Sequence, residues 1–156
     1  MKSVSIHTGQ PHPGAVEALL RDLPEWFGIE ASNRAYVEAA RTLPTTAAIF
    51  DGEVVGVALV RRHTPQASEL ELLLVRRDLH RAGIGRQLLT RVEADLRADG
   101  VELLQVKTLG PSAASPGYER TRAFYAATGF VPLEERTDIW GPGNPCLISV
   151  KVLRDA

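Results

Sequence analysis

The chain has 156 residues, of which 44% are hydrophobic and 24% are charged, and its formal net charge at pH 7 is −1. This length and composition predict a single domain over residues 1–156, without the biased composition of a disordered protein. The small net charge excludes a general electrostatic attraction to nucleic acid or to an anionic membrane surface.

Signals for targeting and for metal binding are missing from the sequence. No apolar run approaches the roughly 20 residues of a membrane span, and the first residues lack the apolar core of a signal peptide. We therefore expect a cytoplasmic protein with no membrane partner. Cys146 is the single cysteine, and the four histidines show no ligand spacing. An internal disulfide is excluded, and we expect no metal.

The N-terminal part of the chain predicts a short strand followed by two helices. Alternating apolar and polar residues indicate a strand over residues 4–7, and a helix over residues 15–23 follows it. Ser32 is placed to cap a second helix that runs to about residue 43. Between the helices, Trp26 and Phe27 either line an acceptor pocket or fill the core, and the sequence leaves both interpretations open.

Three strands should then form an antiparallel meander. The runs 45–50 and 53–62 are joined at Asp51-Gly52, a dipeptide favoured in tight hairpins because both central residues need positive φ. A third strand is expected over residues 68–76. Alternation along it separates two sets of side chains: Leu70, Leu72 and Leu74 on one face, and Glu69, Glu71, Leu73 and Val75 on the other.

The remaining chain predicts two more helices and three more strands. A helix should open after Gly83 and end near Gly100, and a strand should follow over residues 101–108. A helix is expected from about Tyr118 to Thr128. The last two strands are predicted over residues 130–135 and 146–153.

The turn into the first of these two helices carries the clearest binding signal. Ala82, Gly83, Ile84 and Gly85 offer successive backbone amides at a helix start, where the dipole favours an anion, and Arg81 and Arg86 flank them. A tight turn without a ligand would have the same pattern. Leu88 stands where a dinucleotide fingerprint needs its third glycine, and no Gly-Lys-Ser/Thr triplet follows Gly85, so two other phosphate-binding folds are excluded.

Two motifs resemble the GNAT superfamily of N-acyltransferases. LxVRRDLHRAGIGRQLL is similar to the family's acetyl-CoA loop, with Leu73 and Val75 as its strand residues and His80 at the position of its Gln or Arg. RTRAFYAATGF is similar to the family helix that ends Tyr-x-x-x-Gly-Phe, here Tyr125, Gly129 and Phe130. Tyr118 stands where family members often carry Asn.

This resemblance implies an α/β fold (α+β by layer arrangement), with a central mixed, mostly antiparallel sheet flanked by about four helices. It implies acetyl-CoA as co-substrate. The residues expected to bind it are Leu73, Leu74, Val75, His80, Arg81, Ala82, Gly83, Ile84, Gly85, Arg86 and Tyr125. The Leu73 amide would meet the thioester carbonyl, and the backbone at Val75 would hold the pantetheine arm as an added strand does.

Acetyl transfer to an amine requires a base for the amine and an acid for the leaving thiolate. Glu69 is the first choice as base and Glu71 is its competitor, while an exposed sheet face with no catalytic role is the alternative for both. Tyr125 is implied as the acid, and its alternative is a packing role beside Phe124 on the apolar stripe of its helix.

The sequence predicts an N-acetyltransferase that acts on a primary amine, with a small-molecule acceptor favoured. A protein N-acetyltransferase is one alternative, and a non-catalytic acyl-CoA sensor or interaction module is another. A homodimer is left open.

Overall fold

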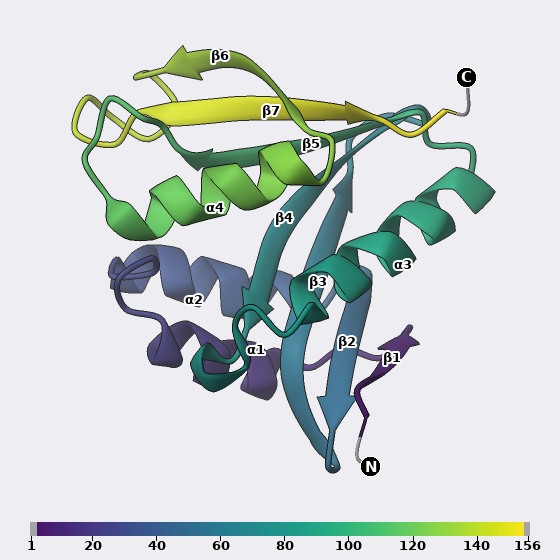
Figure 1. The fold of residues 1–156 in the computed structure, drawn as a ribbon. Coiled ribbons are helices and arrows are strands. Elements are labelled where there is room, and N and C mark those ends of the chain that lie inside the picture. Colours follow the sequence, from purple (N-terminus) through teal and green to yellow (C-terminus); the bar gives the residue numbers. More distant parts are fainter. Residues whose placement is uncertain (1–2, 155–156) are drawn as a thin grey trace. The chain divides into compact units, whose positions relative to one another are not determined.

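The computed structural model describes residues 3–154, and these form seven strands of a mixed sheet and four α-helices (Figure 1). This confirms the predicted α/β architecture. The elements in chain order are β1 (Ser5–Thr8), α1 (Pro13–Asp22), α2 (Glu30–Ala39), β2 (Thr45–Phe50), β3 (Glu53–Arg62), β4 (Ala67–Val75), the 3-10 helix η1 (Arg77–Leu79), α3 (Ile84–Ala98), β5 (Leu103–Leu109), α4 (Pro116–Ala127), β6 (Val131–Arg136) and β7 (Cys146–Val152).

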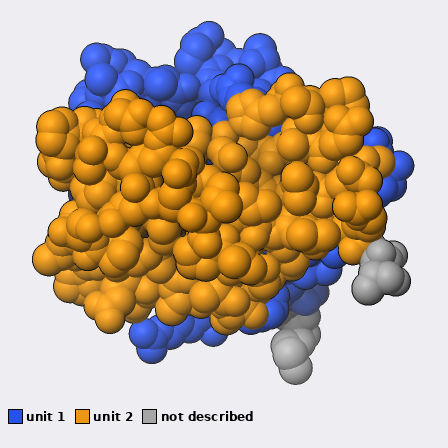
Figure 2. Space-filling view, turned by 90° about the horizontal axis from the view of Figure 1, so that it is seen from above, with its two compact units in different colours: residues 1–61, 70–99 blue, residues 62–69, 100–156 orange. Residues whose placement is uncertain are grey.

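The chain divides into two compact units, which Figure 2 distinguishes by colour. The first contains residues 1–61 and 70–99, and the second contains residues 62–69 and 100–156. Strand β4 contributes its first three residues to the second unit and the rest to the first.

The first unit contains the first hairpin of the predicted meander, strands β2 and β3, which pair antiparallel. Strand β1 pairs antiparallel with the other edge of β2, and β4 follows β3 in the strand order of the sheet. The turn between β2 and β3 has φ of 53° at Asp51 and 79° at Gly52. Both central residues therefore adopt the left-handed conformation that the Asp-Gly dipeptide predicts, and the hairpin is confirmed.

Helices α1 and α2 cover the core of the first unit. Side chains of α1 pack with alternate residues of β3 and β4, and the shared cluster includes Val16, Leu20, Leu59, Leu72 and Leu74. The predicted Ser32 cap is wrong, since α2 begins at Glu30 with Ile29 at its N-cap and Ser32 inside its first turn. An acidic residue in the first turn complements the helix dipole, and this offers one reason for the earlier start.

Gly56 on β3 allows helix α3 to approach the sheet closely. A Cβ atom at this position would lie 3.0 Å from Cδ1 of Leu88 and 3.3 Å from Cγ2 of Ile84, and 3.2 Å from the carbonyl oxygen of Leu74. Real Cβ atoms rarely make contacts this short, and a backbone oxygen cannot move aside easily. Gly56 therefore sets how closely the first turn of α3 packs on β3.

Replacing Gly56 with alanine should lower the free energy of unfolding by about 1–3 kcal/mol, because the added methyl group overpacks the contact. Urea unfolding followed by circular dichroism measures this. Gly14→Ala is the matched control, since a Cβ at Gly14 meets nothing within 4 Å. That variant should leave stability unchanged or raise it by up to about 1 kcal/mol. Equal stability of the two variants would contradict the close-approach role of Gly56.

The second unit contains strands β5, β7 and β6, paired antiparallel in that order. Helix α4 precedes β6 and begins at Pro116, with Ser115 as its N-cap accepting a hydrogen bond from the Tyr118 amide at 3.3 Å. The predicted start at Tyr118 is therefore wrong by two residues. Proline at the first helical position has its φ preset for a helix and needs no amide partner there.

Candidate functional site

The turn between β4 and α3 contains two residues with positive φ, and the amide of Ala82, predicted to be available to a ligand, instead donates to the Leu79 carbonyl at 3.3 Å. Arg81 has φ of 64° and Gly83 has φ of 83°. Helix α3 starts at Ile84, and the first helical hydrogen bond runs from the Gln87 amide to the Gly83 carbonyl at 3.0 Å. The amides from Gly83 to Arg86 precede that bond, so helix geometry leaves them without an intrahelical acceptor.

Space and charge around this turn suit an anion. A Cβ built on Gly83 meets nothing within 4 Å. Arg81, Ala82, Gly83 and Arg86 are exposed, whereas Ile84 is buried and fixes the helix start on the core. Free amides at a helix N-terminus with two flanking guanidinium groups form a cradle for a phosphate.

Arg77 ties this turn to the end of α1. Its amide donates to Oδ2 of Asp22 at 2.8 Å, and its guanidinium donates to the Asp22 carbonyl at 3.0 Å. The guanidinium also pairs with Glu25, which holds the pKa of that carboxyl below its ordinary value. Cζ of Arg77 lies 6.0 Å from the centre of the Trp26 ring. Sequence reasoning did not identify Arg77, because its partners are more than 50 residues away in the chain.

His80 makes its contacts within the protein. Its Nε2 lies 2.7 Å from the Val75 carbonyl oxygen, and its amide donates to the Arg77 carbonyl at 3.2 Å. A carbonyl can only accept, so Nε2 carries the proton and donates. The ring also stands edge-on to Trp26, with centroids 5.9 Å apart. His80 therefore joins the end of β4 to the turn, and its Nε2 proton is already engaged.

The last residues of β4 lie in the first unit with this turn. Leu74 is 1% exposed and packs into the core, whereas Leu73 and Val75 are half-buried on the opposite face. Glu71, on the face of Leu73, pairs with Arg61, whose Nε lies 3.3 Å from its Oε2. Alternation along β4 is thus as predicted.

Glu69 lies in a different environment, in the second unit. It is 6% exposed, and its Oε1 lies 2.8 Å from Nε2 of His63, 3.3 Å from Nε2 of Gln105 and 3.5 Å from Nζ of Lys107. The alternative that Glu69 lies on an exposed sheet face is therefore wrong. Sequence reasoning missed these three partners, although alternation along β5 already places Gln105 and Lys107 on one face.

Tyr125 of α4 is buried among aromatic rings. It is 8% exposed, and its ring centroid lies 5.3 Å from those of both Phe124 and Phe130 in edge-to-face contacts. Burial, with a smaller contribution from Tyr118, raises the pKa of the Tyr125 phenol well above its ordinary value. The hydroxyl therefore stays protonated at neutral pH.

Tyr125 should stay protonated at about pH 10, where a tyrosine with an ordinary pKa ionises. Tyrosinate absorbance up to about pH 11 should thus be the same in the wild type and in Tyr125→Phe. Because the unfolded chain releases this proton at a lower pH than the folded chain, wild-type stability falls as the pH rises through that range, and less steeply in the variant. A smaller tyrosinate signal in the variant would show that Tyr125 ionises normally.

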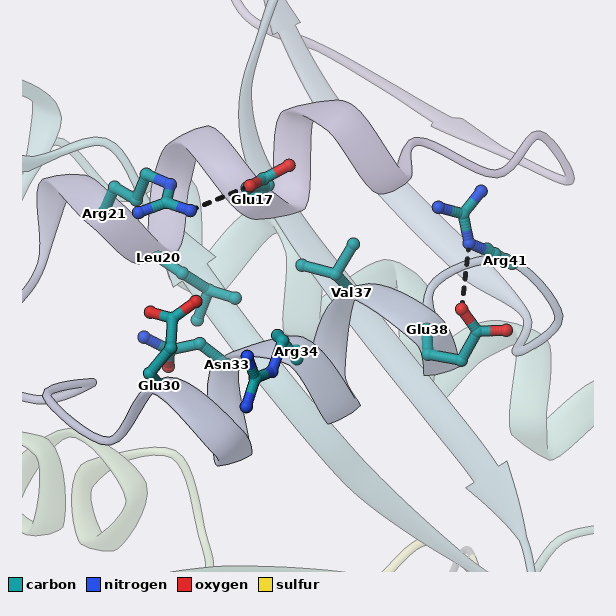
Figure 3. A pocket seen from close by; sticks show the side chains of 9 residues that line it. All are labelled: Glu17, Leu20, Arg21, Glu30, Asn33, Arg34, Val37, Glu38 and Arg41. Atoms are coloured by element: carbon teal, nitrogen blue, oxygen red, sulfur yellow. Dashed lines mark hydrogen bonds and ion pairs between the residues drawn. The ribbon is translucent and has the colours of Figure 1, made fainter.

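The first unit also has a pocket of about 250 Å³ between α1 and α2 (Figure 3). Arg21 pairs with Glu17 at 3.0 Å, and Arg41 pairs with Glu38 at 3.1 Å. Oδ1 of Asn33 is buried there without a hydrogen-bond partner among the described residues. None of the site residues predicted from the sequence lines this pocket.

Two further properties concern residues 3–154. No helix in this range is long and apolar enough to cross a membrane. Within the same range, no three His, Cys, Asp or Glu side chains are grouped so that they could hold a metal ion.

Comparison with known proteins agrees with the fold. The profile of the acetyltransferase (GNAT) family matches residues 13–130. A search of curated proteins by sequence found no significant match.

Solved structures of low sequence identity share the fold. The ribosomal-protein-S18-alanine N-acetyltransferase of Escherichia coli is 17% identical with a TM-score of 0.78, covering 99% of this chain and 96% of that chain. The aminoglycoside 6'-N-acetyltransferase of Enterococcus faecium is 18% identical with a TM-score of 0.75, covering 97% and 98%. A GNAT family acetyltransferase of Elizabethkingia anophelis with acetyl-CoA bound is 18% identical with a TM-score of 0.70, covering 96% and 97%. Since the family profile spans most of the sequence, the chain belongs to the acetyltransferase (GNAT) family.

Proposed function

We propose that this protein transfers an acetyl group from acetyl-CoA to the primary amine of a small molecule. The single observation that carries the donor is the turn at Gly83, where consecutive amides lie open at a helix start between two arginines. The negative charge of a pyrophosphate would complement the amides and the two guanidinium groups of this turn. The relative from Elizabethkingia anophelis, whose structure holds acetyl-CoA, supports the same donor.

Strand β4 continues the proposed donor site. The Val75 backbone would pair with the pantetheine arm in the manner of an added strand, and the Leu73 amide would donate to the thioester carbonyl. The side chain of Leu74 is in the core, so only its backbone is available to the donor. His80 contributes by fixing the Val75 carbonyl, through the 2.7 Å hydrogen bond from its ring.

Two groups are assigned to proton transfer. An alkylammonium with a pKa of about 10 must lose a proton before it attacks, and Glu69 is the carboxylate proposed to assist this step, directly or through a group bonded to it, with Glu71 as its competitor. The amine nitrogen then forms the C–N bond, the C–S bond breaks, and CoA leaves as a thiolate. Tyr125, protonated because burial raises its pKa, would donate a proton to that sulfur.

A small molecule is the favoured acceptor. The relative from Enterococcus faecium is an aminoglycoside acetyltransferase, and the small net charge of this chain offers no broad field for a charged macromolecule. The relative from Escherichia coli acts on a ribosomal-protein alanine and keeps a protein acceptor as the second candidate.

A competition assay separates the two acceptor classes. Acetyl-CoA is supplied with equal amounts of a panel of primary amines (aminoglycosides, polyamines and amino acids) and a panel of peptides with free N-termini or lysines. Mass spectrometry then identifies which molecules gain an acetyl group. We expect acetylation in the small-amine panel, and acetylation confined to peptides would overturn the small-molecule assignment.

A further inference from the structure

His63 forms a histidine–carboxylate pair in the second unit that the sequence did not predict. It lies in the turn between β3 and β4, where its amide donates to the Ala67 carbonyl at 3.0 Å. Its ring Nε2 lies 2.8 Å from Oε1 of Glu69. The Glu69 side chain is 7% exposed, whereas that of His63 is 44% exposed. A buried carboxylate thus holds one end of an imidazole that solvent can reach.

Other groups around the carboxylate come from neighbouring strands. From β5, Gln105 Nε2 and Lys107 Nζ lie 3.3 Å and 3.5 Å from the same Oε1 atom. From β7, burial raises the pKa of the Cys146 thiol above its ordinary value, and the charges of Lys107, Glu69, Arg136 and Asp138 also act on it. The thiol is neutral at physiological pH, so Lys107 and His63 are the cationic or basic partners of this carboxylate.

The pairing determines which ring nitrogen can act. A carboxylate only accepts hydrogen bonds, so the proton of the neutral imidazole is on Nε2, which donates to Glu69. Nδ1 is then left with a lone pair. An imidazole whose far nitrogen donates to a carboxylate is held in one tautomer and one orientation.

Glu69 itself is poorly placed to take a proton from an incoming amine. One of its oxygens is contacted by three donor groups, and its side chain is almost fully enclosed. An amine would have to displace an existing partner to reach that oxygen. His63 is more accessible.

We propose that Nδ1 of His63 is the proton acceptor for the amine substrate, and that Glu69 is a positioning residue that acts through His63. This inference rests on the proposed function. Nδ1 takes one proton from the substrate ammonium, and the nitrogen lone pair so released forms the C–N bond as the C–S bond breaks. The imidazolium returns its proton to solvent through its exposed face. The nitrogen loses its second proton as the amide forms, and the thiolate gains one, so the net products are amide, CoA thiol and one proton.

The test compares His63→Gln with Glu69→Gln, using the best amine from the panel and the release of CoA thiol across pH. An imidazole works only when it is neutral, so kcat/KM should rise with pH along a limb that His63→Gln removes. His63→Gln should lower kcat/KM at neutral pH by about 10²–10³-fold, the scale for losing a general base. The Glu69→Gln side chain retains an oxygen that can accept a hydrogen bond from Nε2 of His63. This variant should therefore lose less kcat/KM than His63→Gln, and its kcat/KM should still rise with pH.

Chemical rescue gives an independent readout. His63→Ala opens a partly exposed space, and added imidazole should restore a measurable part of its activity. His7→Gln is the matched control, because His7 is an exposed histidine of β1 whose ring contacts Ser5. It should match the wild type. Acetyl-CoA affinity should be the same in all variants.

Each contrary outcome has a separate meaning. Full activity in His63→Gln, a larger loss in Glu69→Gln than in His63→Gln, or no rescue of His63→Ala by imidazole would overturn the role of His63 while the wild type remains an active enzyme. Wild-type protein that binds acetyl-CoA and releases no CoA with any amine would overturn the proposed function, and this inference with it.

Discussion

Replacing Gly83 with valine should weaken acetyl-CoA binding by about 100-fold or more. The residue has φ of 83°, where a non-glycine residue costs about 1–2 kcal/mol and a β-branched one is a clear outlier. The space beside its Cα is empty of protein atoms within 4 Å. A valine side chain would fill the space that the pyrophosphate is proposed to occupy, and it would keep phosphate oxygens away from the amides.

The control for this substitution is at the other end of the same helix. Gly100 has φ of 80°, and a Cβ there also meets nothing within 4 Å. Gly100→Val therefore imposes a similar backbone strain away from the proposed phosphate site. Isothermal titration calorimetry should show near-normal acetyl-CoA affinity for Gly100→Val and a large loss for Gly83→Val. Equal affinities in the two variants would contradict the phosphate assignment of the turn.

Tyr125→Phe should lower kcat by about 10–1,000-fold and leave acetyl-CoA affinity nearly unchanged. The substitution keeps the aromatic ring, so the edge-to-face contacts with Phe124 and Phe130 are retained and the fold should be as stable as before. Only the phenolic hydroxyl group, with its proton, is removed. Because burial raises the pKa of the phenol, that proton is present over the whole range of a rate measurement.

Single-turnover kinetics separate this chemical role from product release. Tyr36→Phe is the control, since Tyr36 is also an aromatic residue in ring contact, with Phe27 at 6.1 Å, and has no assigned role in the reaction. It should leave the rate of acetyl transfer unchanged. A wild-type rate in Tyr125→Phe would remove Tyr125 from the mechanism and leave it a packing role.

Local patterns in the sequence predicted the parts of the fold that depend on neighbouring residues. The Asp51-Gly52 hairpin follows from the φ values that two adjacent residues require. The alternation of Leu70, Leu72 and Leu74 follows from the two-residue period of a strand, and all three are buried. The turn at Gly83 was found because a helix start and a positive φ are both local properties.

Contacts between residues distant in the sequence were not predictable from such patterns. Glu69 was recognised as a carboxylate on a strand face, but its burial depends on Gln105 and Lys107 of β5, more than 30 residues further along the chain. Arg77 likewise gains its role from Asp22. Strand order and helix docking decide these contacts, and a single sequence does not reveal them.

The predicted starts of two helices were wrong for a different reason. Ser32 is a good N-cap residue by type, but α2 begins two residues before it, at Glu30. Pro116 likewise begins α4 ahead of the predicted Tyr118. Several residues in each region could serve as the first of the helix, and their capping preferences differ by only about 1 kcal/mol. The free energy of packing the helix on its unit is large enough to decide which of these residues begins the helix.

The release of CoA thiol by the purified protein tests the central claim most directly. Acetyl-CoA is supplied with and without the panel of primary amines, and free thiol and acetylated amine are both quantified. Acetyl transfer predicts that at least one amine stimulates thiol release and that each thiol is matched by one acetylated amine molecule. Saturable binding of acetyl-CoA with no amine-dependent thiol release would contradict the account and would favour a non-catalytic acyl-CoA sensor.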